Sequence, residues 1–475
     1  MPQRNSTSGA PRAANVIFHS AEKFSDELRT AFDVQRALQK EDFINAIGIS
    51  LTTYEKKKPP SAEQQRILKE LRDVHKVSSK PYQAGEFDEP FHLKITQSGC
   101  EFDGTCEELT EEHLKTWFEN ASVSGYGDNQ SLETKTDPNV RDAREISCDA
   151  FSVRPELLEK INSTWQEKFF YPASVHVAPY KIHIYGPHGH FKSHRDTPEP
   201  GLIGTFLLGV GETYESQTYK SLYADGVFHI GDRTFRADIG EWIAFYPDVP
   251  HSISPLPQNY YRAVIAFKIF SNGTGDLTFS HDLELQERVE KILHHIPRPF
   301  GILLDHSYHL GAVELNGYDK ILLAAAQNYQ DSIVHVLPVI ISTVSESYYD
   351  EEYDQESHEL RSSYNADIKP FLPAHIDILN KRFTPEAEQA VKFFEGVEHV
   401  PFYCSDFQQS AGLWEQEESE IDFTGNEADG TRESSIYLSH ALLVLSTGED
   451  RAVKAGADTK KSELVARVLY DIRYG

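Results

Sequence analysis

The chain has 475 residues, of which 39% are apolar, so it is long enough for one large globular core with a second unit or substantial additions. Its 74 acidic and 46 basic residues give a formal net charge of −28 at pH 7. A surface with this charge repels phosphate backbones and anionic lipid headgroups, so nucleic acid and membranes are not expected partners.

Cysteine usage and hydropathy bear on the cellular compartment. The four cysteines are scattered without the clustering of a zinc site, which fits a reducing environment (Cys100, Cys106, Cys148 and Cys404). The first thirty residues lack the apolar core of a signal peptide, and no segment approaches the ~20 apolar residues of a membrane-spanning helix. We therefore expect a cytoplasmic or nuclear protein.

The N-terminal part of the chain predicts a tail followed by helices. Residues 1–15 are polar and rich in Pro, Ser and Ala, which is typical of a disordered tail. Residues 16–150 are expected to be mainly helical. Within them, Ser61 and Gln64 have the spacing of a capping box, and apolar residues then recur at helical spacing (Ile67, Leu68, Leu71 and Val74).

The sequence pattern changes near Val175 to short runs of β-forming residues separated by Gly, Pro and Asp. Many short strands at close spacing predict a sandwich or barrel. We expect an α+β protein whose catalytic core is a double-stranded β-helix, or jelly roll, over residues 151–275. Helical patterns return after Asn272, and residues 276–475 are expected to form a C-terminal α/β extension whose role the sequence does not indicate.

A candidate metal site lies in the segment YGPHGHFKSHRDTP, residues 185–198. Residues two apart on a strand project to the same face, so His194 and Asp196 can bind one ion. His251 follows 57 residues later, directly after the strand-like run EWIAFYPDVP, where a jelly roll would return the chain beside the first pair. Two histidines and one carboxylate leave open coordination positions, which is the arrangement of non-haem Fe(II) oxygenases.

Arg262 opens an apolar strand eleven residues beyond His251. A guanidinium in an apolar barrel needs an anion, and its planar fork matches a carboxylate. The distal carboxylate of 2-oxoglutarate would meet this need and leave the 2-oxo acid end to chelate iron. Lys268 shares the strand face of Arg262, but six residues span ~20 Å of strand, so the two are not expected in one pocket.

Each of these residues also has an ordinary structural interpretation. A His-x-Asp pair is often a surface hydrogen bond, a single histidine is often part of a core, and an arginine often pairs with a structural carboxylate. The order His-x-Asp, His, Arg within one β-rich block favours the site. Histidines without a carboxylate at ligand spacing are expected to line the pocket or form turn hydrogen bonds (His183, His188 and His190). His306 and His309 are expected to be structural, and three aromatic residues are candidate cavity walls (Phe191, Trp242 and Phe245).

The segment resembles the catalytic domain of prolyl 4-hydroxylase-like 2-oxoglutarate oxygenases, in which a Tyr-Gly-x-x-Gly hairpin leads into His-x-Asp. Tyr185 stands nine residues before His194, and Gly186 and Gly189 flank the turn. By this resemblance, Tyr185 lines the 2-oxoglutarate pocket with its hydroxyl near a cosubstrate carboxylate. The cofactors implied are Fe(II), 2-oxoglutarate as cosubstrate, and ascorbate as a further candidate.

Longer passages are similar to a large, mainly fungal group of iron- and 2-oxoglutarate-dioxygenase-domain proteins without assigned substrates. The similarity covers about residues 115–445, including FKSHRDTP, YRAVIAFKIF and GILLDHSYHLGAVELNGYDKILL. The chain departs from the wider family at residues 214–218, where a Gly-Gly-x-Leu strand is common, and at Arg262, where prolyl hydroxylases often have Lys. These departures leave the iron ligands unchanged.

The resulting prediction is a dioxygenase that hydroxylates a protein side chain such as proline, or a small molecule, and releases succinate and CO₂. Its partner is thus an unknown protein or small-molecule substrate, and no catalytic residue beyond the metal ligands is predicted. Two alternatives are a cupin-like metalloenzyme that uses no oxo acid and a non-catalytic binding scaffold. Arg262 argues against the first, and the complete ligand set argues against the second.

Overall fold

A computed structural model describes a large part of the chain, and its described residues form two compact units. Unit 1 comprises Met1–Val77, Leu283–Ala411 and Leu438–Gly475, and unit 2 comprises Ser78–Asp282 and Gly412–Tyr437. The described residues are 15–18, 61–78, 80–128, 133–169, 175–197, 199, 201–213, 226–231, 233–272, 280–308, 315–329, 331–348, 361–370, 376–377, 382–383, 400–405, 423–424, 438–446 and 466–469.

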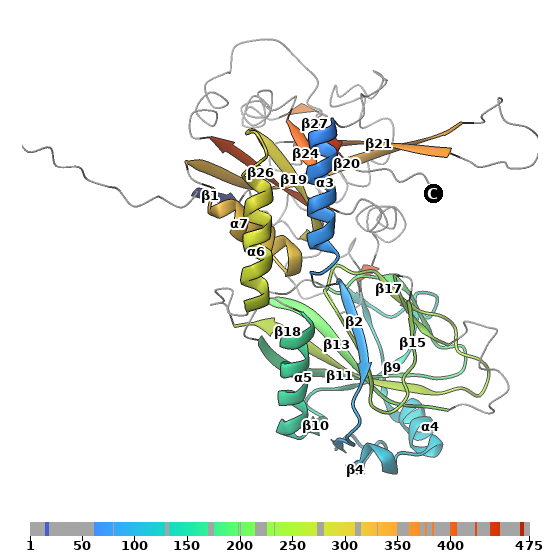
Figure 1. The fold of residues 1–475 in the computed structure, drawn as a ribbon. Helices are drawn as coiled ribbons and strands as arrows, with labels where there is room; N and C mark the ends of the chain where they lie inside the picture. Colours follow the sequence, from blue (N-terminus) through green and yellow to red (C-terminus); the bar gives the residue numbers. More distant parts are fainter. Residues whose placement is uncertain are drawn as a thin grey trace, which may run out of the picture. The chain divides into compact units, whose positions relative to one another are not determined.

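Unit 2 is built on two antiparallel sheets (Figure 1). The seven-stranded sheet has the order β2 (Tyr82–Glu86), β16 (Glu241–Phe245), β13 (Leu202–Glu212), β18 (Arg262–Ser271), β11 (Val175–Tyr185), β9 (Arg144–Ser147) and β5 (Ser122–Val123). The five-stranded sheet has the order β15 (Arg233–Phe235), β14 (Phe228–Ile230), β17 (His251–Ile253), β12 (His190–His194) and β8 (Arg141–Asp142). Two three-stranded sheets complete the unit, β10 (Phe151–Val153), β3 (His92–Ile95) and β4 (Phe102–Thr105), and β25 (Phe423–Thr424), β6 (Tyr126–Asp128) and β7 (Glu133–Lys135).

The core of unit 2 forms around the long central strands β11, β13 and β18. Strands β13 and β18 are buried over most of their length, and β11 is buried mainly in its second half. Helix α5 (Pro155–Lys168) begins with a proline in its first turn and buries Leu157, Ile161 and Trp165, which recur every four residues on one face. Gly204 on β13 makes room for this helix, because a Cβ atom there would lie 2.0 Å from the Trp165 ring. Helix α4 (Glu111–Asn120) and the 3-10 helix η1 (Cys106–Glu108) lie before α5 in the chain.

Unit 1 contains a mixed seven-stranded sheet with its own apolar core. The strand order is β1 (Asn15–Phe18), β20 (Ser332–Tyr348), β21 (Arg361–Pro370), β27 (Ala466–Leu469), β24 (Pro401–Tyr403), β19 (Phe300–Tyr308) and β26 (Leu438–Ser446). An additional pairing of β20 with β26 joins the sheet back on itself. The unit also holds the helices α3 (Ala62–His75), most of α6 (Ser280–Leu293) and α7 (Gly317–Gln327) (Figure 1). Strands β22 (Ile376–Asp377) and β23 (Arg382–Phe383) form a short antiparallel pair.

The predicted α+β class is confirmed, and the capping box of Ser61 and Gln64 is present at the start of α3. The prediction of a mainly helical region over residues 16–150 is wrong for its described part, which contains strands β2 to β9. These strands are only two to five residues long and pair mostly with distant segments, so they leave little periodic signal in the sequence. Unit 2 accordingly begins at Ser78, well before residue 151.

The structure also bears on the predicted jelly roll, the N-terminal tail, the cysteines and the absence of membrane-spanning helices. The two antiparallel sheets of unit 2 agree with a jelly roll, whereas closure into a double-stranded β-helix stays a prediction. The predicted tail, residues 1–15, lies outside the described residues except for Asn15, which starts β1. All four cysteines are free thiols. Among the described helices, none has the length and apolarity needed to cross a bilayer.

Candidate metal site and its cavity

The three predicted metal ligands converge in unit 2. His194 ends β12, Asp196 follows two residues later, and His251 begins β17. Strands β12 and β17 are antiparallel neighbours with His194 directly opposite His251. All three residues are buried, and one ligand atom from each lies within 4.8 Å of the others. Within the described parts of the chain, this is the only group of three or more such residues that could hold a metal ion.

Backbone carbonyl groups fix the orientation of both imidazole rings. His194 Nδ1 lies 2.7 Å from the Lys192 carbonyl oxygen, and His251 Nδ1 lies 2.9 Å from the Val249 carbonyl oxygen. Because a carbonyl can only accept, each Nδ1 carries the proton and each Nε2 presents the lone pair. Hydrogen bonds of this kind set the tautomer of metal-binding histidines.

The carboxylate of Asp196 is oriented by its neighbours. The Thr205 hydroxyl on β13 donates a short hydrogen bond to Asp196 Oδ2, and the Asp196 backbone N–H donates to the Pro247 carbonyl at 3.1 Å. The other oxygen, Oδ1, lies 3.9 Å from His251 Nε2. One carboxylate oxygen is therefore held by the protein, and the other faces the imidazole pair.

The surroundings keep His194 in the form that binds metal. Burial lowers the pKa of His194 well below its usual value, and the nearby His251 and Arg141 lower it further. The ring stacks on Phe191 with centroids 3.6 Å apart and meets His251 edge-on at 4.2 Å. A neutral imidazole is thus favoured at neutral pH, as metal coordination requires.

A cavity between the two sheets contains the triad. Apolar and aromatic side chains from both sheets line most of it (Tyr185, Phe191, Leu207, Phe228, Phe245, Ile253, Val264 and Ala266). The predicted walls Phe191 and Phe245 are among them. Trp242 is not, and packs instead against Phe206 with ring centroids 5.1 Å apart. Such a lining favours the exclusion of bulk water from the metal ligands.

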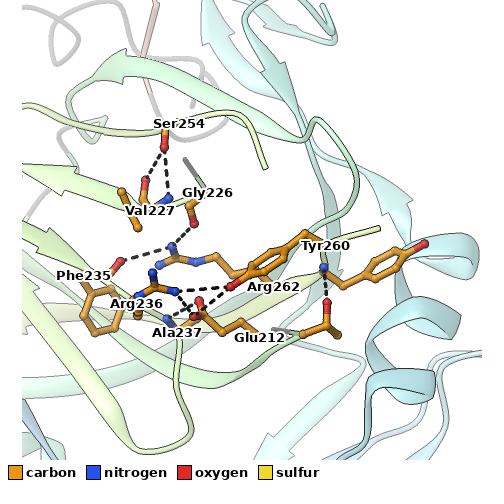
Figure 2. Close-up of polar contacts among 11 residues, drawn as sticks. Glu212, Gly226, Val227, Phe235, Arg236, Ala237, Ser254, Tyr260 and Arg262 are labelled. Carbon is orange, nitrogen blue, oxygen red and sulfur yellow. Dashed lines mark hydrogen bonds and ion pairs between the residues drawn. The ribbon is translucent and has the colours of Figure 1, made fainter. Parts of the chain in front are cut away.

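Arg262 is fully buried but does not line this cavity. Its Nη1 donates to the carbonyl oxygens of Gly226 at 3.1 Å and Phe235 at 3.3 Å, as Figure 2 shows. Its Nε and Nη2 atoms are buried without a hydrogen-bond partner among the described residues. Burial lowers the pKa of Arg262, and the charge of Glu212 opposes this effect. The guanidinium therefore has unused capacity to bind an anion.

The carboxylate nearest to Arg262 in strand register is already used by other groups. Glu212 on β13 lies opposite Arg262, but its oxygens accept from Arg236 Nη1 at 2.8 Å, the Ala237 N–H at 3.2 Å and the Tyr260 hydroxyl at 3.3 Å (Figure 2). Glu212 is therefore engaged by Arg236, Ala237 and Tyr260, and no hydrogen bond between it and Arg262 is present.

Tyr185 connects the cavity with Arg262. It lines the cavity, is almost fully buried, and is the register partner of Arg262 on the neighbouring strand. Burial raises the pKa of the Tyr185 hydroxyl, so the group stays protonated and is able to donate a hydrogen bond.

The cavity also contains residues that the sequence analysis did not assign to the site. Arg141, Thr205 and Lys268 all line it. Arg262 and Lys268 do not line the same cavity, as the length of strand between them predicted. The cavity that contains the triad is lined by Lys268 and not by Arg262. The lysine forms an ion pair with Glu199 and lies 3.9 Å from the centre of the Tyr180 ring. No motif marked these residues, because sheet pairing alone brings them to the cavity.

Comparison with known proteins gives distant matches among solved structures. No family model and no curated protein sequence matches the chain. A prolyl-4-hydroxylase of Pseudomonas putida is 11% identical, with 43% of this chain and 100% of that chain covered and a TM-score of 0.25. The viral collagen prolyl hydroxylase of Paramecium bursaria Chlorella virus-1, in complex with 2-oxoglutarate, is 10% identical, with coverages of 40% and 96% and a TM-score of 0.25. A prolyl hydroxylase of Trichoplax adhaerens, bound to a peptide of hypoxia inducible factor, is 12% identical, with coverages of 44% and 94% and a TM-score of 0.27. Similarities this low establish neither the fold nor an activity, so the site itself must carry any assignment of function.

Proposed function

We propose that the protein is an Fe(II)- and 2-oxoglutarate-dependent dioxygenase. The observation that carries this proposal is the buried group of His194, Asp196 and His251, whose two imidazoles are held with Nε2 as the lone-pair nitrogen. Two histidines and one carboxylate with open coordination positions suit non-haem Fe(II) better than structural zinc, which usually has four protein ligands with cysteine among them.

The donor set fits the metal that it implies. His194, Asp196 and His251 would hold Fe(II), and Thr205 would keep the Asp196 carboxylate in its ligating orientation. Fe(II) bound there would supply the activation of O₂ that is coupled to conversion of 2-oxoglutarate into succinate and CO₂. The apolar walls would exclude water, which otherwise competes for the open positions.

Arg262 and Tyr185 are the proposed binding groups for the cosubstrate. Arg262 has two buried N–H-bearing atoms without a hydrogen-bond partner in the part of the chain that the structure describes, and a bidentate carboxylate would satisfy both. Tyr185 reaches the cavity from the strand position opposite Arg262 and would donate a hydrogen bond to the same cosubstrate. In this arrangement the distal carboxylate lies beyond Tyr185, and the oxo acid end faces the triad.

The finer predictions stay proposals. We infer hydroxylation of a protein side chain such as proline, or of a small molecule, in the cytoplasm or nucleus, without nucleic-acid or membrane partners. Ascorbate as a further cofactor and a relationship to the mainly fungal group are also proposals. The C-terminal region, residues 276–475, contributes most of the described strands of unit 1, and its role is open.

A second candidate function is a cupin-like metalloenzyme that uses no oxo acid. The observation in its favour is that Arg262 does not line the cavity of the triad. In that case, Arg262 would balance the charge of Glu212 and have no role in binding a cosubstrate. The two candidates share the metal site and differ in whether 2-oxoglutarate binds to it.

Metal stoichiometry and succinate release test the first candidate. The protein reconstituted anaerobically with Fe(II) is expected to bind one iron and to release succinate from 2-oxoglutarate when O₂ is admitted. Asp196→Ala should lose stoichiometric iron and succinate release but keep the fold, because one of three ligands is gone. Asp142→Ala is the matched control, since Asp142 lies on β8 beside the site but does not line the cavity. Full iron and turnover in Asp196→Ala would contradict the assignment.

A further inference from the structure

Arg141 is held in the cavity wall by hydrogen bonds to neutral groups. It lies on the short strand β8, opposite Phe191 of β12, and is buried. Its Nη1 donates to the Gly125 carbonyl oxygen at 2.7 Å, its Nη2 lies 2.9 Å from His183 Nδ1, and its guanidinium also forms a hydrogen bond with the Tyr185 hydroxyl. The guanidinium carbon lies 4.5 Å from the centre of the Phe191 ring. Together these contacts fix the orientation of the guanidinium.

The chemistry of a guanidinium sets the direction of these hydrogen bonds. It has five N–H donors and no acceptor, so the partners of Arg141 must accept. The Tyr185 oxygen accepts from Arg141, and the hydroxyl proton therefore points away from the guanidinium. His183 Nδ1 also accepts, which leaves the proton of the neutral ring on Nε2. Burial lowers the pKa of His183 well below its usual value, and the charge of Arg141 lowers it further, so the ring is neutral.

Both partners on β11 line the cavity of the triad. His183 and Tyr185 are two residues apart on the strand and project to the same face. Burial raises the pKa of the Tyr185 hydroxyl, which therefore keeps its proton. An oxygen atom of a molecule bound in the cavity would thus meet Tyr185 as a hydrogen-bond donor, with the direction of the donor set by Arg141.

We propose that Arg141 is a positioning residue for the cosubstrate, which holds the Tyr185 hydroxyl with its proton directed at a carboxylate oxygen of 2-oxoglutarate. This inference rests on the proposed function, because it takes Tyr185 as a binding group for 2-oxoglutarate. Arg141 acts through Tyr185 and needs no contact of its own with the cosubstrate. A hydroxyl that is already oriented loses less freedom on binding than one that rotates, so it binds a carboxylate more tightly.

A double-mutant cycle tests the proposal. Tyr185→Phe removes the donor but keeps the ring, and Arg141→Gln removes the group that orients the donor. The dissociation constant of 2-oxoglutarate is measured by titration of the anaerobic Fe(II) protein for the wild type, both single variants and the double variant. We expect Tyr185→Phe to weaken binding by about 10-fold, the scale of a hydrogen bond to a charged group, and Arg141→Gln to weaken it by about 3–10-fold. In the Tyr185→Phe background, Arg141→Gln should weaken binding by less than about 2-fold, because the group through which it acts is gone.

Other roles of Arg141 give a different result in this cycle. A general structural role, or a direct attraction between the charge of Arg141 and the cosubstrate, would weaken binding by the same factor with and without the Tyr185 hydroxyl. Equal factors in the two backgrounds, or unchanged binding in a folded Arg141→Gln protein, would overturn the proposal. If Arg141→Gln does not fold, the cycle is run with Arg141→Lys, which keeps the charge but loses the planar fork, and the same two results decide.

Arg144→Gln is the matched control. Arg144 lies three residues away on β9, with its guanidinium 5.0 Å from the Phe118 ring and outside the cavity lining, so this variant should keep the wild-type dissociation constant. A wild-type protein that binds no 2-oxoglutarate would contradict the proposed function. A wild type that binds it, with independent effects of the two substitutions, would contradict only the role of Arg141, so the two failures are distinguishable.

Discussion

Both units bury a cluster of histidine and carboxylate side chains, and the two clusters are arranged in opposite ways. In unit 2, His194, Asp196 and His251 direct ligand atoms toward one another across a cavity. In unit 1, His75 Nε2 lies 2.5 Å from Asp305 Oδ2, and the neighbouring Asp319 is surrounded by donors. The two clusters contain the same residue types and are both buried. They differ in whether their polar atoms face a cavity or are paired with one another, and this difference distinguishes a candidate site from a structural cluster.

The cluster around Asp319 has the character of a structural element. Asp319 accepts from the backbone N–H groups of Asp305 at 2.8 Å and His306 at 3.0 Å, and from the Tyr308 hydroxyl at 2.8 Å. These contacts tie the start of α7 to strand β19. The interpretation of His306 as a structural residue agrees with this position, and His309 lies outside the described residues.

The largest effect is expected on the stability of unit 1, from a substitution in the cluster around Asp319. Asp319→Ala would leave two backbone N–H groups and one hydroxyl without their acceptor, and each buried unsatisfied group costs about 1–3 kcal/mol. We expect the free energy of unfolding of unit 1 to fall by roughly 3 kcal/mol or more, measured by chemical denaturation, while iron stoichiometry stays unchanged. The exposed Asp73→Ala in α3 serves as control and should change little. Iron loss in a folded Asp319→Ala protein would show that the clusters are not independent.

The second prediction concerns unit 2 and the proposed binding of 2-oxoglutarate by Arg262. Arg262→Lys keeps the positive charge but loses the planar fork, so the affinity for 2-oxoglutarate should fall by about 1.5–3 kcal/mol. Iron affinity should hardly change, because Arg262 does not contact the triad. The measurement is a 2-oxoglutarate titration of the anaerobic Fe(II) protein. An unchanged midpoint would remove Arg262 from the site and favour the metalloenzyme that uses no oxo acid.

The third prediction concerns the residue that orients a ligand. Thr205→Val keeps the shape of the side chain but removes the hydrogen bond to Asp196 Oδ2. Loss of such a supporting contact typically lowers metal affinity by about 10–100-fold. Competition with a calibrated chelator measures the iron dissociation constant, and chemical denaturation of the iron-free protein checks that the variant is folded. Wild-type affinity in Thr205→Val would show that the Asp196 carboxylate needs no support from β13.

The convergence of His194, Asp196 and His251 could be predicted from the sequence because local rules suffice for most of the arrangement. Alternation along a strand places His194 and Asp196 on one side, and a histidine after a neighbouring strand is a plausible third ligand. The pairing of β12 with β17 then sets His194 opposite His251. Tyr185 reaches the cavity for a similar reason, since β11 ends beside it.

The rest of the site depends on contacts that have no local pattern. Strand β8 has two residues, so nothing in the sequence predicts that Arg141 would pair with Phe191 and enter the cavity wall. The position of Arg262 outside the cavity lining depends on how its side chain packs among Gly226, Phe235 and Glu212. Long-range pairing also explains why the short strands β2 to β9 form in the region that was expected to be mainly helical.

The central claim is that the triad binds Fe(II) and that this iron binds 2-oxoglutarate. Its most direct test is to add 2-oxoglutarate to the anaerobic Fe(II) protein and to follow the metal-to-ligand absorption band. We predict a saturable band at one 2-oxoglutarate per iron in the wild type, and no band in Asp196→Ala. A wild-type protein that holds stoichiometric iron at the triad but develops no band at saturating 2-oxoglutarate would contradict the account.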